Sequence, residues 1–243
     1  MAAAHPDRPN RYAVHQPNFL PWCGYFAKIA AVDAFVLLDD AQMPRGRSYV
    51  SRVAIRKGEE SCWLSVPLQR RHPEEIRDVR LDGGDWRIAH RNLLKDRYGR
   101  EPAFEEALAV VSPVYEEPHT SLASFNIDLL GRFCEWLEIS GRMVLASSLG
   151  VAGKGDERIA RIGQCLGAGC YVSGKGGENY QSDSTFSQHG IRLHVSDASG
   201  AWEKLDPLPG VSKAHSLFEA AAVMGREGAA RLIGKLAAKM IDD

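Results

Sequence analysis

The 243-residue sequence has no long hydrophobic run and almost no net charge. No stretch reaches the roughly 20 apolar residues that a membrane-spanning helix needs. The polar, proline-rich beginning, MAAAHPDRPN, lacks the hydrophobic core of a secretory signal. These absences predict a cytoplasmic protein with no membrane partner. A formal net charge of −1 provides no field that would attract nucleic acid from a distance, so DNA and RNA are not expected as general partners.

The sequence also lacks the common signatures of metal sites and hydrolases. Its five cysteines include no CxxC pair, which argues against structural zinc and predicts free thiols in a reducing compartment. No GxSxG elbow and no HExxH helix is present. Cys23 is not favoured as a nucleophile, because nothing in the sequence indicates a lowered pKa of its thiol.

The most informative segment is 15–40, HQPNFLPWCGYFAKIAAVDAFVLLDD. It predicts a strand that ends at His15, a loop stiffened by two prolines, an amphipathic helix, and a second strand that ends at Asp39 and Asp40. In open α/β sheets, ligands bind outside the carboxyl ends of the strands. We therefore expect the histidine and the two carboxylates to face one crevice.

Each of these groups has a functional and a structural interpretation. His15 can act as a general base, a proton donor or a phosphate contact, or it can be a histidine hydrogen-bonded within a turn. Asp39 and Asp40 can hold a divalent cation or polarise a nucleophile. Neighbouring strand residues point to opposite faces, so both carboxylates reach one ligand only where the chain bends, and one of them is expected to be a cap or turn residue.

The rest of the chain predicts an α/β fold: a mostly parallel sheet flanked by helices, with a β-hairpin insertion and a helical middle region. Asp85 is expected to cap the first middle helix. The C-terminal region predicts two helices broken near Gly225 and Gly228. No repeat, low-complexity tract or long linker divides the chain. We expect a single domain over 1–243, made of a motif-bearing part with the hairpin (10–70), the helical region (85–140) and a second α/β part with C-terminal helices (141–243).

A glycine-rich loop follows the predicted strand 170–172. Its backbone amides could cradle an anion while Lys175 supplies positive charge. The loop has neither Walker nor GxGxxG spacing, so a simple turn is the alternative. A basic run near the hairpin would suit a phosphate or carboxylate partner. For every member except Arg52, a position on a solvated face is the favoured interpretation. The run consists of Arg45, Arg47, Arg52, Arg56 and Lys57.

The run HQPNFLPWCGYFAKI, followed by DAFVLLDDAQ, resembles the opening of the WbqC-like family, bacterial proteins often encoded with O-antigen and secondary-metabolite biosynthesis. The resemblance covers nearly the whole chain. Two positions depart from the family pattern: Ser51 replaces an asparagine and His215 an acidic residue. Beyond the opening run, the positions that match the family are Arg52, 63–67, Tyr98, Pro102, Phe104, Asn126, Ser147, Ser148 and 166–180.

The resemblance implies a transferase that moves an activated aminoacyl group, such as glycine, to an amine and so forms an amide. In this interpretation the catalytic candidates are His15, Asp39 and Asp40. The candidates for substrate binding are Gln16, Asn18, Tyr25, Arg52, Ser173, Gly174, Lys175, Gly176, Gly177, Asn179 and Tyr180. The expected partners are an amine or amino-sugar acceptor and an activated amino-acid donor, carried as a thioester on a carrier protein or, less in keeping with the neutral charge, on a tRNA.

Two alternatives stay open. The order of strand, proline-containing loop, helix and strand is similar to that of nucleotidylyltransferases and pantothenate synthetase, although the HxGH signature is missing. This analogy allows an ATP-dependent ligase or nucleotidyl transferase with Mg-ATP as cofactor. A non-catalytic binding protein of a biosynthetic complex is the third hypothesis.

Overall fold

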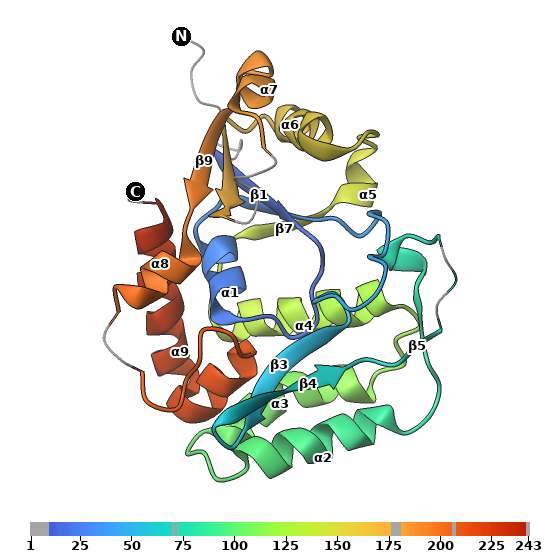
Figure 1. Cartoon of the computed structure of the whole chain (residues 1–243), viewed down its shortest axis with the longest axis vertical. Helices are drawn as coiled ribbons and strands as arrows, with labels where there is room; N and C mark the ends of the chain where they lie inside the picture. Colours follow the sequence, from blue (N-terminus) through green and yellow to red (C-terminus); the bar gives the residue numbers. More distant parts are fainter. Residues whose placement is uncertain (1–9, 70, 72, 176–180, 206–207, 242–243) are drawn as a thin grey trace.

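The computed structural model describes residues 10–69, 71, 73–175, 181–205 and 208–241. A five-stranded parallel sheet with the order β7-β2-β1-β8-β9 forms its centre (Figure 1). Counted along the chain, this order is 3-2-1-4-5. The sheet thus grows from β1 to one edge and then, from β8, to the other. The strands are β1 (Arg11–His15), β2 (Ala34–Leu37), β7 (Arg142–Leu145), β8 (Cys170–Gly174) and β9 (Arg192–Ser196).

Both faces of the sheet are covered, because successive strand residues enter two different cores. On β1, Tyr12 and Val14 pack into one apolar cluster, whereas Ala13 packs into the other. Figure 1 shows helices α6 and α7 on one side of the sheet and α1, α4 and α9 on the other. The flanking helices are α1 (Cys23–Ala30), α4 (Leu122–Trp136), α5 (Ala146–Leu149), α6 (Gly155–Leu166), α7 (Asp183–Gln188), α8 (Ala198–Glu203) and α9 (Leu217–Ile241).

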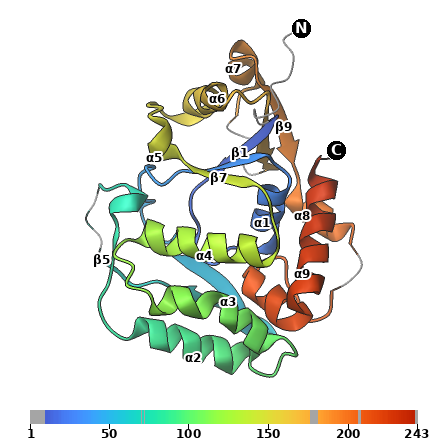
Figure 2. The same ribbon diagram turned by 180° about the vertical axis from the view of Figure 1, so that it is seen from behind.

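The hairpin and the middle helices form a layer of their own beside α4 (Figure 2). The hairpin is antiparallel and turns through two residues, with Gly58 at φ +61°. Below it lie α2 and α3 (Figures 1 and 2). The elements of this region are β3 (Arg52–Lys57), β4 (Glu60–Ser65), β5 (Leu68–Gln69), the 3-10 helix η1 (Ile76–Asp78), β6 (Arg80–Leu81), α2 (Trp86–Tyr98) and α3 (Phe104–Glu116).

The predicted fold class is confirmed, including the hairpin, the helical middle and the break in the C-terminal helix. That break falls at Gly225, whose φ of 65° and ψ of −177° are not helical. The capping role predicted for Asp85 is wrong: this residue precedes α2, but its side chain makes no capping hydrogen bond. In the part of the chain that the structure describes, no helix has the length and apolar character needed to cross a bilayer.

Candidate active site at the switch point of the sheet

The strand order places a crevice between β1 and β8, where the direction of sheet growth reverses. Open α/β sheets bind ligands at this point, outside the carboxyl ends of the strands. A pocket of about 410 Å³ lies there. Its described lining comes from β1, α1, β8, β9, α8 and the end of α9: Val14, His15, Trp22, Gly24, Tyr25, Lys28, Tyr171, Ser173, Gly174, Lys175, Gln181, Ser196, Asp197, Ala198, Ser199 and Met240.

His15 is held in one orientation at the end of β1. Its Nδ1 donates to the carbonyl oxygen of Gln16 at 3.1 Å, and the hydroxyl of Tyr25 donates to the same oxygen at 2.8 Å. The rings of His15 and Tyr25 meet edge to face, with 4.7 Å between their centroids. Because Nδ1 faces an acceptor, it carries the proton in the neutral ring, and Nε2 keeps a lone pair. Burial, with the nearby charge of Lys28, lowers the pKa of His15 to about 4, so its imidazole is neutral at pH 7.

Lys28 supplies a partly buried ammonium to the same pocket. It is the one charged residue of α1, whose sequence is CGYFAKIA. Its Nζ lies 3.1 Å from the position that a Cβ on Gly174 would occupy, so the absence of a side chain at Gly174 makes room for it. Burial lowers the pKa of Lys28 to about 8. A desolvated cation next to backbone at a strand exit is suited to attract a negative charge on a ligand.

The exits of β8 and β9 are tied to each other on the far wall of the pocket. Ser196 donates its hydroxyl to the carbonyl oxygen of Ser173 at 2.7 Å. Asp197 accepts from the backbone N–H of Gly200 at 2.9 Å and from Nζ of Lys175 at 2.8 Å. Both donors lower the pKa of Asp197, and the N–H of Gly200 has the larger effect. Its carboxylate is the one acidic group in the described lining.

The structure brings together only part of the predicted site. His15, Tyr25, Ser173, Gly174 and Lys175 line one pocket. The side chains of Gln16 and Asn18 are not part of its described lining; Asn18 is buried, and Gln16 contributes the carbonyl that orients the histidine. The predicted residues Gly176, Gly177, Asn179 and Tyr180 lie outside the described residues.

The expectation that Asp39 and Asp40 share the crevice with His15 is wrong in geometry. Asp39 is buried, and both of its oxygens accept hydrogen bonds from Ser147. Asp40 forms an ion pair with Arg158 at 2.6 Å and lines a different pocket, between β2 and α6. Both aspartates stand at the exit of β2, as the pattern predicted. There the chain turns toward α5 and α6 instead of toward the switch point.

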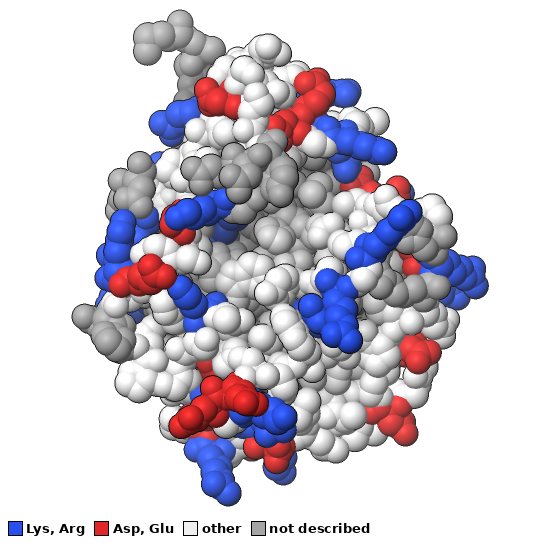
Figure 3. Space-filling model, viewed as in Figure 1, with Lys and Arg blue, Asp and Glu red and all other residues white. Residues whose placement is uncertain are grey.

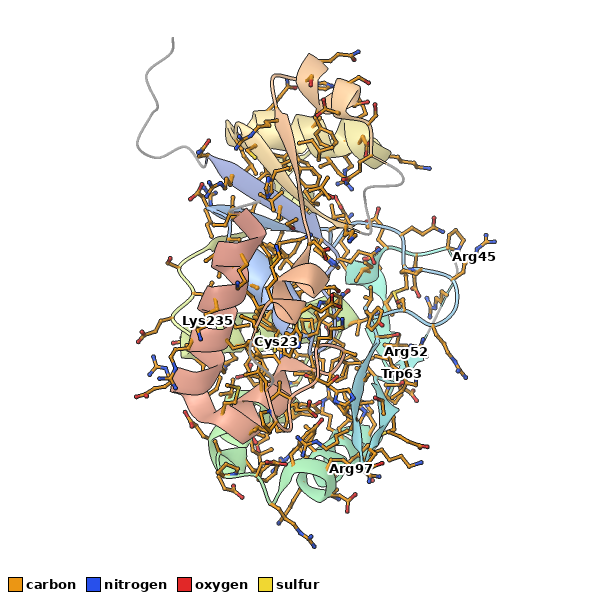
Figure 4. All side chains as sticks on the ribbon, turned by 60° about the vertical axis from the view of Figure 1, so that its left-hand side comes forward. Cys23, Arg45, Arg52, Trp63, Arg97 and Lys235 are labelled. Atoms are coloured by element: carbon orange, nitrogen blue, oxygen red, sulfur yellow. The ribbon has the colours of Figure 1, made fainter. Side chains whose placement is uncertain are left out.

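The basic residues near the hairpin also have separate surroundings. The guanidinium of Arg52 lies 3.9 Å above the ring of Trp63, and Figure 4 shows the two side by side on the hairpin. Arg56 does not belong to a solvated face, because it pairs with Glu219 and Glu101. Figure 3 shows uncharged atoms in the middle of this side of the molecule, with Lys and Arg side chains on either side of them.

Two further groups of side chains have the residue types of reactive or metal-binding sites. Cys23 is buried, which raises the pKa of its thiol to about 12 and disfavours the nucleophilic thiolate. Among the described residues, three possible metal ligands come together at Glu117, His119 and Asp128. Arg132 pairs with both of these carboxylates, through Oε1 of Glu117 and Oδ1 of Asp128, so their negative charge is already balanced by a cation of the chain itself.

Sequence reasoning missed Lys28, Gln181 and Asp197. A signal was available for Lys28, because a single charge within an otherwise apolar helix next to the histidine motif requires a polar environment. Asp197 lies between a short strand and α8. The hydrophobic pattern indicated the strand but not this helix. In the sequence, Asn126 stands out only as a motif position. It is fully buried, and its Nδ2 donates to the carbonyls of Pro17 and Val50 at 2.8 Å each, which fixes the loop after β1.

The doubly wound sheet and its switch-point pocket define an α/β protein with the architecture of small-molecule enzymes and binding proteins. The model of the WbqC-like protein family matches residues 16–206, and the chain belongs to this family. It is also 33% identical over 220 residues to a protein of Mycobacterium tuberculosis named uncharacterized protein Rv1507c, and the match covers 89% of this chain and 95% of that protein. No solved structure matches the chain.

Proposed function

We propose that the chain is a biosynthetic transferase that moves an activated aminoacyl group, such as glycyl, to the amine of a small or sugar-like acceptor. The observation that carries the proposal is the pairing, in one pocket, of a neutral imidazole, whose Nε2 has no hydrogen-bond partner among the described residues, with a desolvated ammonium. Both contribute to amide formation, the first as a base for the amine proton and the second as a positive charge that stabilises the developing oxyanion.

In the proposed reaction the acceptor amine attacks the carbonyl carbon of the donor thioester. The carbon–nitrogen bond forms, and the carbonyl oxygen becomes an oxyanion next to Lys28. The nitrogen of the adduct is then cationic and strongly acidic, so His15 can accept its proton on Nε2 although the pKa of His15 is low. When the adduct collapses, the carbon–sulfur bond breaks, and the proton passes from His15 to the departing thiolate.

The charges of the pocket support an aminoacyl donor. An aminoacyl group carries an ammonium, and Asp197 supplies the acidic group of the described lining to receive it. Lys175 is bonded to that carboxylate and lies at the exit of β8, where the phosphate of a carrier arm or of a nucleotide would find positive charge. The pocket volume of about 410 Å³ fits a small ligand of this kind.

The test is turnover of purified protein with a panel of aminoacyl thioesters and amines, including amino sugars, with detection of the amide by mass spectrometry. His15→Gln should lower the rate at least about 100-fold, the usual effect of losing a general base. His90→Gln is the matched control, because burial likewise lowers the pKa of His90 to about 4 and one nitrogen of its ring, here Nε2, bonds a backbone carbonyl, that of Ser65. Full activity of His15→Gln, or equal losses in both variants, would overturn the assignment.

The ATP-dependent alternative is supported by the position of the pocket, since switch points of doubly wound sheets bind nucleotides. Its expected magnesium ligands do not reach the pocket, because Asp39 is bonded to Ser147 and Asp40 to Arg158. Calorimetry with Mg-ATP distinguishes the two functions. A heat of binding that the native protein shows and Lys28→Met does not would favour the ligase. If the chain is a non-catalytic binding protein, His15→Gln would leave the amount of final product that the biosynthetic pathway makes unchanged.

A further inference from the structure

A second set of reactive side chains lies outside the pocket, at the β3–β4 hairpin. The hydroxyl oxygen of Ser61, on β4, is 2.6 Å from Nε2 of His215. On the other side of the same ring, Nδ1 is 2.9 Å from Oε2 of Glu219. Because Nδ1 faces a carboxylate, it carries the ring proton and donates, which leaves Nε2 to accept the hydroxyl proton of Ser61.

The fold holds the three residues in this order. The chain at His215 runs beside β3, where the backbone N–H of Ser216 donates to the carbonyl of Ala54 at 3.1 Å. Glu219 follows one helical turn later, at the start of α9. Ser61 stands directly across the hairpin from Arg56, so both side chains lie on the same face of the two strands.

Glu219 is fixed as an acceptor by several donors besides the histidine. It is 1% exposed, and it accepts from the backbone N–H of Ser212 at 2.7 Å, from Nε of Arg56 at 3.2 Å and from the hydroxyl of Tyr98 at 3.3 Å. His215 is 7% exposed, whereas Ser61 is exposed to solvent. Exposure thus increases from the carboxylate through the imidazole to the hydroxyl, as an activated serine requires.

We propose that Ser61, His215 and Glu219 form a nucleophilic acyl-transfer site that accepts the acyl group of an activated ester or thioester. The Ser61 oxygen forms a bond to the acyl carbon as the carbon–oxygen or carbon–sulfur bond of the donor breaks. The Ser61 proton passes to Nε2 of His215 and from there to the leaving alkoxide or thiolate, while Glu219 accepts from Nδ1 and orients the ring.

This proposal does not rest on the proposed function, because none of the three residues lines the switch-point pocket. Their neighbourhood suits a donor with an anionic leaving group. Trp63 lies two residues beyond Ser61 on the outward side of β4 and is 45% exposed, with the guanidinium of Arg52 stacked on it (Figure 4). A flat apolar ring and a cation on the same face of the hairpin as the nucleophile would contact the carrier part of such a donor.

The experiment uses the full chain and a fluorophosphonate probe, which traps an activated serine by forming an oxygen–phosphorus bond and releasing fluoride. We expect the native protein to gain the mass of one probe and peptide mapping to place it on Ser61. Ser61→Ala should lose the label. His215→Gln should react on the order of 100-fold more slowly. Ser65→Ala is the matched control, because Ser65 is an exposed serine on the same side of β4, and it should react like the native protein.

Mapping on the native protein keeps the test valid even where a variant folds poorly, and urea unfolding of Ser61→Ala and His215→Gln reports their stability. A native protein that stays unlabelled at Ser61, while a known serine hydrolase in the same tube is labelled, would overturn the proposal. So would equal labelling of Ser61 in the native protein and in folded His215→Gln. His15→Gln should keep the label, so failure of this site and failure of the proposed transferase are distinguishable.

Discussion

Ser147 holds the carboxylate of Asp39 with two hydrogen bonds: its hydroxyl donates to Oδ2 at 2.6 Å, and its backbone N–H donates to Oδ1 at 3.0 Å. The bonds join the exit of β2 to the first turn of α5, which directly follows β7. The two strands are neighbours in the sheet, but the two residues are 108 positions apart in sequence. Asp39 is therefore a connector between strand ends.

We predict that Ser147→Ala lowers the free energy of unfolding by about 1.5–3 kcal/mol, the usual range for a hydrogen bond to a charged group. The buried carboxylate of Asp39 would lose its hydroxyl partner and keep only the backbone donor. Ser148→Ala is the control, because that exposed hydroxyl donates to the carbonyl of Leu145 and its loss should cost about 0.5–1 kcal/mol. Urea unfolding measures both, and equal losses would contradict the connector role.

The sequence predicted what depends on local pattern. Apolar runs and their flanking turns located the five strands and most of the helices, and the strand-exit rule placed His15 in one pocket with Ser173 and Gly174. The pattern did not reveal which groups meet across the sheet. Asp39 stands where predicted, but its distant partner decides its role.

The same reason explains the other omissions. Ser61 and His215 are 154 positions apart, and no motif spacing marks such a pair. Lys28 reaches the pocket because Gly174, on a strand that comes much later in the chain, lacks a side chain there. Only the register of β1 against β8 brings α1 and that glycine together. Pairings of this kind depend on tertiary packing, which single-sequence reasoning does not supply.

We predict that Lys28→Met stabilises the fold while it lowers transfer. Burial lowers the pKa of Lys28 from 10.5 to about 8, so its charged form is less favourable in the folded than in the unfolded chain. Below pH 8 this cost is fully present, and it disappears as the pH rises from 8 to 10.5. At pH 7 the variant should gain about 1–3 kcal/mol in free energy of unfolding.

The control for Lys28 is Lys28→Arg, which keeps the charge at every pH near neutrality and should gain no stability. Urea unfolding at pH 7 and pH 10 measures the difference, and the gain of Lys28→Met over the native protein should shrink at the higher pH. A buried ammonium that binds the ligand but lowers the stability of the folded chain is expected in a functional site. A loss of stability in Lys28→Met would show that its methylenes and charge contribute to packing instead.

The two histidines with lowered pKa values predict acid sensitivity. His15 and His90 both have a pKa of about 4 in the folded chain, against 6.5 when unperturbed, and for each burial is the main cause. The unfolded chain therefore binds more protons between pH 4 and 6.5, and stability falls as the pH falls through that range. Each histidine should account for about 3 kcal/mol over the full range.

His90→Gln tests this contribution without touching the pocket. The difference in free energy of unfolding between the native protein and the variant should change by about 3 kcal/mol between pH 7 and pH 4, since carboxylates titrate in both proteins and cancel. Urea unfolding at half-unit pH intervals gives the two curves. Parallel curves would mean that the pKa of His90 is the same in the folded and the unfolded chain.

Gly163 sets the distance between α6 and the sheet. A Cβ at this position would lie 2.5 Å from both the hydroxyl oxygen of Tyr12 and the Cδ1 of Ile191, closer than packed atoms approach. Tyr12 cannot simply move away, because it is buried and its hydroxyl donates to the carbonyl of Ile159 in the same helix at 2.9 Å. Gly163→Ala should therefore destabilise the protein by about 1–3 kcal/mol, the usual cost of overpacking.

Gly234→Ala is the matched control for that substitution. Gly234 also lies within a helix, α9, but apart from the backbone of that helix no atom of the described residues is within 4 Å of the Cβ that it would gain. Relief of glycine's backbone entropy should stabilise the protein there by about 0.5–1 kcal/mol. The two variants should thus move the urea midpoint in opposite directions. Because Tyr12 is on β1, three residues before His15, Gly163→Ala should also reduce transfer if the helix displaces that strand, whereas Gly234→Ala should leave transfer unchanged.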